Sequence, residues 1–377
     1  KNFDNEFTRY LLYRNFQDPY AWSYLNGNSC LDIFDIICLG YSIDRLIDIQ
    51  VNSGDGNDSL KLENLARWNG LDHDDAHNAV SDVYATIQLA KLVNERCPKL
   101  FKHALSLRNV NTTREIVNAQ TGFFRSSVFN GYERRFLSLH TRICDHPTIN
   151  NSVICWNLLN DPLPILDLGA EEIRRQMYSK KEYRTIGVGF DSLRLNKSPM
   201  VVSFSEAEKN LVAEHGTCLR NLESVQRNMN SLTVLARDVF TSIMPEVDPD
   251  ADLYAGDYFG ETRMDAAMCN AVRSDPLTVN DLAFRSIRLH RLFRRLKARN
   301  FFDQLTDPER DQFLSYCSEK FACADNSPWL TKSVFDREMK EVLADINLSK
   351  RQKECLTVLG NYADEVAPSP GKMETEL

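Results

Sequence analysis

A histidine and an aspartate five residues apart, His77 and Asp82, are the sharpest chemical clue in the sequence. They lie in residues 73–93, where apolar residues recur at helical spacing, so the segment predicts an amphipathic helix capped by Asp75. The expected buried stripe is Ala76, Val80, Val83, Ile87 and Ala90. His77 and Asp82 flank this stripe and could reach a groove. Taken alone, such a pair is more often simply solvated.

Two more residues of the same region could join a site. Asp4 precedes a predicted helix, and Lys61 lies in a short turn before another helix, for which Ser59 is the expected N-cap. Carboxylates with a nearby histidine suit metal-assisted phosphodiester hydrolysis, in which two divalent ions about 4 Å apart stabilise the attacking and leaving oxygens. Mg²⁺ prefers oxygen ligands, and histidine is a suitable base because its pKa is near working pH.

Two stretches could contact nucleic acid. Residues 285–301 carry seven Lys or Arg and no acidic residue, and Leu289, Phe293 and Leu296 form the expected core stripe. Four arginines at steps of three, four and four would project from one face and suit phosphate contact: Arg288, Arg291, Arg295 and Arg299. A solvated face or pairing with acidic residues of the same chain is an equal alternative. The aromatic loop 14–29, with Tyr20 and Trp22, could stack bases or simply pack as a loop.

Composition limits the classes of protein to consider. A chain of 377 residues with 43% hydrophobic residues predicts two or three globular domains. The apolar runs are too short to span a bilayer and no signal-like segment opens the chain, so we expect a cytoplasmic protein. The net charge of −8 argues against a nucleic-acid-coated protein but permits a local basic channel.

The ten cysteines are scattered without a C-x2-C pair. A chain of this size needs no disulfide framework, so we expect reduced core thiols. Cys144 with His146, or Cys317 with Cys323, would lack a second ligand pair at zinc spacing.

The pattern of periodicity changes along the chain. Residues 1–97 indicate mixed α/β structure, and residues 98–248 combine short strands, mainly within 121–202, with flanking helices typical of a small barrel. Ser205 and Glu208 predict a capping box for a following helix. Residues 249–367 predict an almost entirely helical domain, after the proline-flanked acidic boundary 245–252. Residues 368–377 are expected to be a disordered tail.

Several short segments of the sequence resemble the motifs of a known nuclease superfamily. HNAVSD, from His77 to Asp82, resembles the third motif of the DEDD exonuclease superfamily in its His-x4-Asp form, and NFD, from Asn2 to Asp4, resembles the second. The chain is more closely similar to the bacterial exonuclease I family, which degrades single-stranded DNA from 3′ to 5′. The matching segments, in order, are YRNFQDPYAWS, SLKLENLARWNGLDH, AHNAVSDVYATIQLAKLV, DLYAGDYF, KARNF and NYADEV.

The resemblance implies an incomplete ribonuclease H-like nuclease domain, an SH3-like barrel with attached helices and a helical C-terminal domain. Asp4 and Asp82 would be ligands of two Mg²⁺ ions, for which Mn²⁺ could substitute, and His77 would be the general base. Lys61 would contact a phosphate, while Tyr20 and Trp22 would contact the strand or pack the loop. The resemblance also implies that the protein is a monomer and that its substrate is single-stranded DNA. A further implied partner is the acidic tail of single-stranded-DNA-binding protein.

The chain departs from the family pattern in two ways. The first motif, Asp-x-Glu, is expected about a hundred residues before Asp4 by resemblance, and the sequence does not contain it. We therefore expect that the sequence is truncated at its N-terminus and that these 377 residues are inactive alone. The stretch after Leu31, DIFDIICLGYSID, has no arginine where the family docks the acidic tail.

Two alternatives stay open. A DEDD exonuclease acting on RNA ends is less consistent with the long C-terminal part, since such enzymes are generally a nuclease domain alone or one joined to a polymerase. A non-catalytic strand-binding or scaffold protein would fit if the absence of Asp-x-Glu belongs to the gene.

Overall fold

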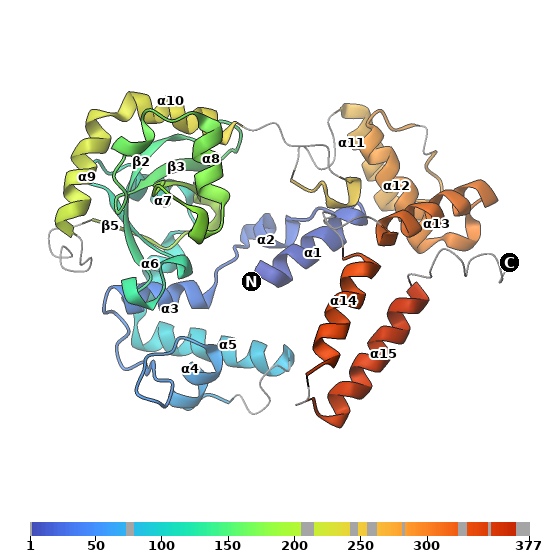
Figure 1. Ribbon diagram of the computed structural model, residues 1–377, viewed down its shortest axis with the longest axis horizontal. Helices are drawn as coiled ribbons and strands as arrows, with labels where there is room; N and C mark the ends of the chain where they lie inside the picture. The colour runs from blue at the N-terminus through green and yellow to red at the C-terminus, as the bar shows by residue number, and fades with distance from the viewer. Residues whose placement is uncertain are drawn as a thin grey trace. The chain divides into compact units, whose positions relative to one another are not determined.

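The chain divides into two compact units. The structure, a computed structural model, describes residues 2–72, 79–204, 215–241, 248–254, 262–280, 283–322, 330–345 and 348–366. Residues 20–245 form the first unit, and residues 2–19 together with 246–377 form the second. Figure 1 labels the α-helices of both units and several of the strands. Helix α1 (Asn2–Arg14), predicted within the first domain, thus packs with elements from the far end of the sequence.

The first unit combines a sheet with helices. Its strands are β1 (Phe123–Ser126), β2 (Leu137–Asp145), β3 (Ser152–Asn157), β4 (Phe190–Arg194) and β5 (Val201–Ser203). Its α-helices are α2 (Ala21–Tyr24), α3 (Ile33–Ser42), α4 (Leu62–Trp68), α5 (Ala79–Arg96), α6 (Pro98–Ser106), α7 (Val110–Val117), α8 (Ala170–Tyr178), α9 (His215–Arg227) and α10 (Met229–Phe240).

The five strands form one antiparallel sheet in the order β4-β3-β2-β1-β5. Both faces of the sheet are covered, because side chains that alternate along a strand enter two different cores. On β3, Val153 and Cys155 belong to one cluster, while Ile154 and Trp156 belong to the other. A Cβ at Gly189 would lie 2.4 Å from the Trp156 ring, so only glycine lets the chain pass this close to the indole.

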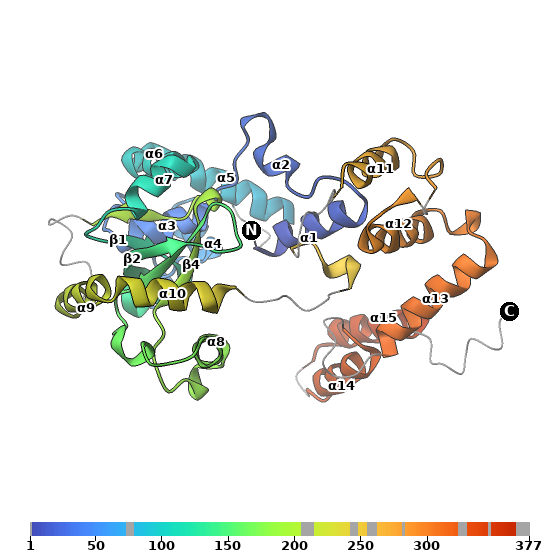
Figure 2. The ribbon, with the colours of Figure 1, turned by 90° about the horizontal axis from the view of Figure 1, so that it is seen from above.

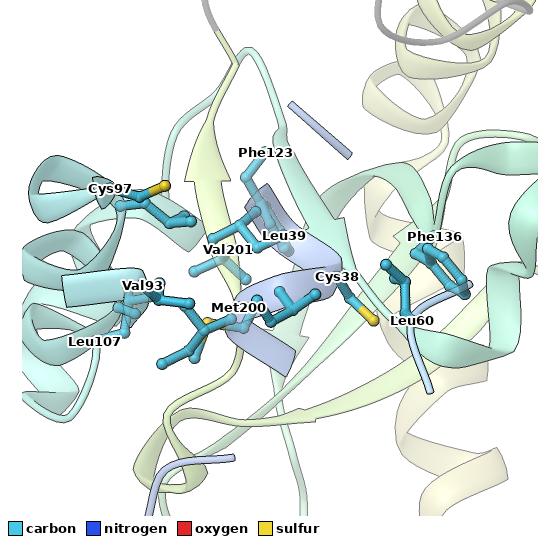
Figure 3. Packing of buried hydrophobic residues seen from close by; sticks show 14 of the residues in the cluster. Cys38, Leu39, Leu60, Val93, Cys97, Leu107, Phe123, Phe136, Met200 and Val201 are labelled. Atoms are coloured by element: carbon cyan, nitrogen blue, oxygen red, sulfur yellow. The ribbon is translucent and has the colours of Figure 1, made fainter. Parts of the chain in front are cut away.

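Helices pack on the two faces of the sheet in separate groups. Helices α3, α5, α6 and α7 contribute to the first cluster, and α8, α9 and α10 contribute to the second. Figure 2 shows α6 and α7 on one side of the strands and α10 on the other. Figure 3 shows the first cluster from close by, with Leu39 of α3, Val93 of α5 and Val201 of β5 converging on one core. The predicted strands within 121–202 are therefore the centre of this unit.

Helix α5 buries a different face from the predicted one. Val80, Val83 and Ile87 are exposed by 62%, 57% and 45%. The buried side chains are instead Ala85, Leu89, Leu92 and Val93, which also recur at helical spacing. Ala76 and the predicted cap Asp75 lie outside the described residues. The helix carries two apolar stripes of the same period, and the stripe with Leu89, Leu92 and Val93 is the one that packs into the first cluster.

The second unit is helical. With α1 it contains the 3-10 turn η8 (Pro249–Ala251), α11 (Arg263–Ser274), α12 (Ile287–Asn300), α13 (Asp307–Ala322), α14 (Lys332–Leu343) and α15 (Lys350–Val366). The predicted core stripe of α12 is confirmed, since Leu289, Phe293 and Leu296 are buried. Lys332 joins α14 to α15 through Asp364, with Nζ 2.8 Å from the carboxylate.

Helix α1 is fixed to η8 by side chains of its last turn. The Tyr13 hydroxyl donates to the Pro249 carbonyl at 3.0 Å, and Arg14 Nε donates to the Asp250 carbonyl at 3.0 Å. Tyr13 is fully buried, whereas Phe7 and Leu11 on the same helix are exposed by 65% and 54%. Tyr13 and Arg14 thus attach the end of α1 to η8.

Several predictions concern the chemical state of the chain. Every cysteine in the described part is a free thiol, as expected, and Cys323 lies outside that part.

Among the described helices, none is long and apolar enough to cross a membrane. The predicted capping box at Ser205 and Glu208 and the predicted disordered tail 368–377 both lie outside the described residues.

The two stripes of α5 can be told apart by substitution. We expect Leu89→Ala to lower the free energy of unfolding by about 2–5 kcal/mol, because Leu89 is 1% exposed and its removal leaves a cavity. Val83→Ala on the exposed stripe is the matched control and should change it by less than about 0.5 kcal/mol. Urea unfolding followed by circular dichroism measures both. The reverse order would mean that the predicted stripe is the buried one.

Candidate functional site

Asp82 lies in the first turn of α5 and is half-buried. The turn is closed by the Thr86 hydroxyl, which donates to the Asp82 carbonyl at 2.7 Å. The buried face of the helix fixes its position against the first core, so Asp82 is carried by a well-packed element. His77, the predicted partner of Asp82, lies outside the described residues.

Asp4 lies in the first turn of α1, and its side chain is exposed. It belongs to the second unit, whereas Asp82 belongs to the first. Both are carboxylates, the ligand type that Mg²⁺ prefers, so their chemistry fits a divalent cation. Within the described residues, however, no group of three or more His, Cys, Asp or Glu is arranged to hold a metal ion.

Lys61 occupies the N-cap position of α4, and its side chain is exposed. The predicted cap, Ser59, is wrong by two residues. Ser59 instead accepts a hydrogen bond from Asn64 Nδ2 at 2.7 Å. The reason is that Leu60 is 1% exposed and its amide donates to the Tyr132 hydroxyl at 2.7 Å, which keeps the chain extended until Lys61.

Tyr20 and Trp22 lie at the start of α2. Tyr20 is half-buried, and Trp22 is 37% exposed. The Ser23 hydroxyl and amide both bond to the Tyr20 carbonyl at 2.8 Å, so this short turn is internally fixed. The structure therefore presents the Trp22 ring partly to solvent, consistent with either predicted role.

The arginine row on α12 does not simply project into solvent. Arg295 forms a bidentate pair with Asp248 at 2.6 and 3.1 Å, and Arg299 lies 3.2 Å from Asp250. Arg288 Nη1 donates to the Tyr13 hydroxyl at 2.9 Å. This corrects the expectation of four outward guanidinium groups. Arg288, Arg295 and Arg299 therefore all have partners within the chain.

Arg291 and Arg299 are the exposed members of the row, and Arg291 shares its helix face with the half-buried Arg288 and Arg295. Arg291 also lines a cavity of about 500 Å³ between α12 and α13, together with the cations Arg294, Arg295 and Lys297 and the acids Glu309 and Glu319. Phosphate contact by the row stays a prediction, and at Arg288, Arg295 and Arg299 it would have to compete with an internal partner.

Asp250 is the centre of a buried charge network that the sequence did not reveal. Its side chain is 4% exposed and lies within 3.4 Å of Arg295, Arg299 and Lys320. The Tyr316 hydroxyl donates to it at 2.8 Å. Burial alone would raise the pKa of this carboxyl, but Arg299 and Arg295 hold the pKa below its usual value. The only sequence signal was the alternation of Asp248, Asp250 and Asp252 in a segment interpreted as a boundary.

A second buried network lies in the sheet. His140 is 2% exposed, with Nε2 3.7 Å from Asp191 Oδ2 and Nδ1 3.5 Å from the Ser138 hydroxyl. Arg125 pairs with the same carboxylate of Asp191. Burial lowers the pKa of His140, so the imidazole is neutral near pH 7. These residue types resemble a hydrolytic triad, but no substrate reaches a serine that is 1% exposed.

Comparison with known sequences identifies the family. Residues 108–242 match the Exonuclease I SH3-like domain, and residues 247–366 match the Exonuclease I C-terminal domain. Exodeoxyribonuclease I of Haemophilus influenzae is 30% identical over 331 residues, covering 84% of this chain and 70% of that protein. The chain belongs to the exodeoxyribonuclease I family. Exodeoxyribonuclease I of Escherichia coli is 29% identical over 97% of this chain and 78% of its own length.

Solved structures of exonuclease I agree with this assignment. The enzyme from Methylocaldum szegediense matches with a TM-score of 0.80 at 29% identity, covering 96% of this chain and 78% of that one. A zinc-bound E. coli exonuclease I complex with single-stranded DNA matches with a TM-score of 0.81 at 29% identity, covering 96% and 78%. An exonuclease I complex with SSB-Ct gives 0.80 at 29% identity, covering 97% and 78%.

Membership of the exodeoxyribonuclease I family confirms two predictions. The fold class is that of exonuclease I, with an SH3-like domain and a helical C-terminal domain. The protein is an exodeoxyribonuclease I-like hydrolase. The family further implies dependence on a divalent metal, for which Asp4 and Asp82 offer suitable ligand atoms.

The network around Asp250 can be tested through its pH dependence. The pKa of Asp250 is lower in the folded state than in the unfolded state. Its carboxylate therefore adds to the free energy of unfolding above the unfolded-state pKa, about 3.9, and this stabilisation is lost as pH falls through the folded-state pKa. At pH 7, Asp250→Asn should lower the free energy of unfolding by about 3 kcal/mol, because it leaves buried cations unpaired. The difference from wild type should shrink below about pH 4.

Urea unfolding at several pH values measures this effect. Asp303→Asn, at an exposed position near the end of α12, is the matched control and should be neutral. An Asp250→Asn variant as stable as wild type at pH 7 would contradict the role assigned to the network.

Proposed function

We propose that this protein is a 3′ to 5′ exodeoxyribonuclease that degrades single-stranded DNA to 5′-mononucleotides in DNA repair and recombination. The observation that carries the proposal is the similarity to E. coli exodeoxyribonuclease I, which extends over 97% of this chain. A structure of E. coli exonuclease I with a dA16 oligonucleotide matches over the same share of the chain, with a TM-score of 0.80. A function in the cytoplasm, where bacterial DNA lies, follows from this proposal.

In the proposed mechanism, Asp4 and Asp82 are ligands of divalent cations. Two Mg²⁺ ions, which Mn²⁺ could replace, would stabilise the attacking and leaving oxygens of the phosphodiester. His77 takes the proton of the attacking water, because an imidazole can change charge near neutral pH. The placement of Asp4 and Asp82 in the first turns of α1 and α5 supports this assignment, since a packed helix holds a carboxylate in a defined position.

The proposed function also implies a division of the chain into domains. We propose that residues 1–97 are the C-terminal part of the nuclease domain and that residues 98–248 are the SH3-like barrel domain with its helices. Residues 249–367 would be the helical C-terminal domain, and residues 368–377 a tail. The family matches at 108–242 and 247–366 support the second and third of these ranges.

Contacts to the DNA strand would come from residues with exposed side chains. We propose Lys61 and Arg291 as phosphate contacts, because both are exposed cations. Trp22 supplies a partly exposed ring for a base, with Tyr20 beside it at the start of the same turn. Arg288, Arg295 and Arg299 would act mainly by holding α12 in place.

A protein partner is also proposed, namely the acidic tail of single-stranded-DNA-binding protein. Cations outnumber the two glutamates in the lining of the cavity between α12 and α13, which would favour an acidic peptide, and α3 carries no arginine that could assist. We expect a pull-down with the tail peptide to retain wild-type protein and to retain less of an Arg294→Ala variant. Retention that is unaffected by this change, or absent altogether, would count against the cavity as the docking site.

The role of His77 is tested by exonuclease activity. In the protein expressed from its complete gene, His77→Ala should lower the rate of mononucleotide release from single-stranded DNA with Mg²⁺ by about 10²-fold or more, because the water loses its base. Binding of the strand without metal should be unchanged. Asp72→Ala, at an exposed position before α5, is the matched control and should retain activity.

The same assay separates the alternatives. Equal rates on RNA and DNA strands would favour an exonuclease acting on RNA ends. Strand binding with no hydrolysis by the wild type would favour a non-catalytic binding protein. Full activity of His77→Ala would remove His77 from the mechanism.

A further inference from the structure

The loop between β1 and β2, residues 127–136, exposes a phenylalanine almost completely. The Phe129 side chain is 93% exposed, and its neighbour Val128 is 42% exposed. A fully buried phenylalanine would contribute about 1.5–3 kcal/mol more than an exposed one, so this position gives up stabilisation. The 127–136 loop therefore presents an aromatic ring that the folded unit itself does not use.

Hydrogen bonds fix the backbone around this ring. The Ser127 hydroxyl accepts from the Phe129 amide at 3.4 Å, and the Ser127 amide donates to the Phe136 carbonyl at 2.7 Å. Asn130 Nδ2 donates to Ser138 Oγ at 2.9 Å and to the Phe136 carbonyl at 3.2 Å. Because these bonds fix the backbone of the loop, the ring projects from a defined position, and little backbone entropy remains to be lost on binding.

The other end of the loop anchors it beside Lys61. The Tyr132 ring packs edge-on against Phe136, with centroids 4.7 Å apart, and its hydroxyl accepts from the Leu60 amide at 2.7 Å. Phe136 is 4% exposed, and Figure 3 shows it next to Leu60 in the first core. Lys61, the next residue, is exposed. An aromatic ring and a cation are thus presented by two segments that are bonded to each other.

We propose that Phe129 stacks on a base of single-stranded DNA while Lys61 contacts the backbone of the same strand. This inference rests on the proposed function and assigns it a surface in the first unit. Aromatic rings beside cationic groups are the usual elements of binding surfaces for single strands, because every base offers a π-face and every nucleotide a charge. The same loop also exposes Val128 and Tyr132, and beside them the charged side chains of Glu133 and Arg134, so a second cation lies in the loop that carries the ring.

Binding measurements without divalent metal test the proposal. Fluorescence anisotropy of a labelled oligothymidylate should show a Kd about 5-fold or more higher for Phe129→Ala than for wild type, the loss expected for one stacked base. The variant should lose no affinity relative to wild type on a strand of abasic nucleotides, which has charge but no bases. Phe129→Trp should bind like wild type and add an indole fluorescence that the strand quenches.

Two further variants separate stacking from charge and from folding. Lys61→Ala should reduce the slope of log K against log salt by about 1, whereas Phe129→Ala should leave the slope unchanged. Tyr178→Ala removes a ring that is 73% exposed on α8 of the same unit and should not change affinity. Thermal unfolding should be the same for wild type and Phe129→Ala, since the ring has almost no buried area.

The outcomes are distinguishable. If wild type binds and degrades the strand while Phe129→Ala binds it equally well, the stacking inference is overturned and the proposed function stands. Equal losses on intact and abasic strands also overturn it. If wild type does not bind single-stranded DNA, both fail. Loss of self-association by Phe129→Ala with unchanged strand affinity would assign the ring to a protein contact instead.

Discussion

The second unit depends on one buried carboxylate. Asp250 lies within a few ångströms of three cations and a tyrosine hydroxyl from α12 and α13, while its backbone carbonyl accepts from Arg14 of α1. A buried carboxylate is tolerated only when charges and hydrogen bonds compensate for the lost hydration. Here the compensation links elements that are far apart in sequence, so a single short turn organises three helices. Arg295 adds to this by stacking over Tyr316, with its guanidinium carbon 3.7 Å from the ring centroid.

The network changes how the basic helix α12 is understood. The seven Lys or Arg in residues 285–301 predict a surface that binds nucleic acid, if only the sequence is considered. Several of these charges instead neutralise aspartates of the same unit, which a linear count cannot detect because the partners lie about fifty residues away. Arg295 belongs to this network and also lines the cavity that faces α13, so an external ligand there would compete with Asp248 for it.

The sequence predicted some features well for physical reasons. The strands within 121–202 follow from β-branched and aromatic residues between turn formers, and the core stripe of α12 from one unambiguous apolar face. Helix α5 was predicted with the wrong face because two stripes satisfy the same period, and only packing decides between Val83 and Leu89. The cap of α4 was misplaced because the burial of Leu60 depends on Tyr132, which is distant in sequence. Asp4 and Asp82 could be singled out only through the family motif, since spacing alone does not distinguish them from solvated acids.

The close approach of Gly189 to Trp156 has a practical consequence for spectroscopy. The Trp156 indole is fully buried, meets Phe190 edge-on at 4.9 Å and donates from Nε1 to the Asn160 carbonyl at 2.9 Å. Trp22 and Trp68, by contrast, are partly exposed. The sheet therefore contains an intrinsic fluorophore in a dry environment, whose blue-shifted emission reports the integrity of the first unit independently of events at its surface.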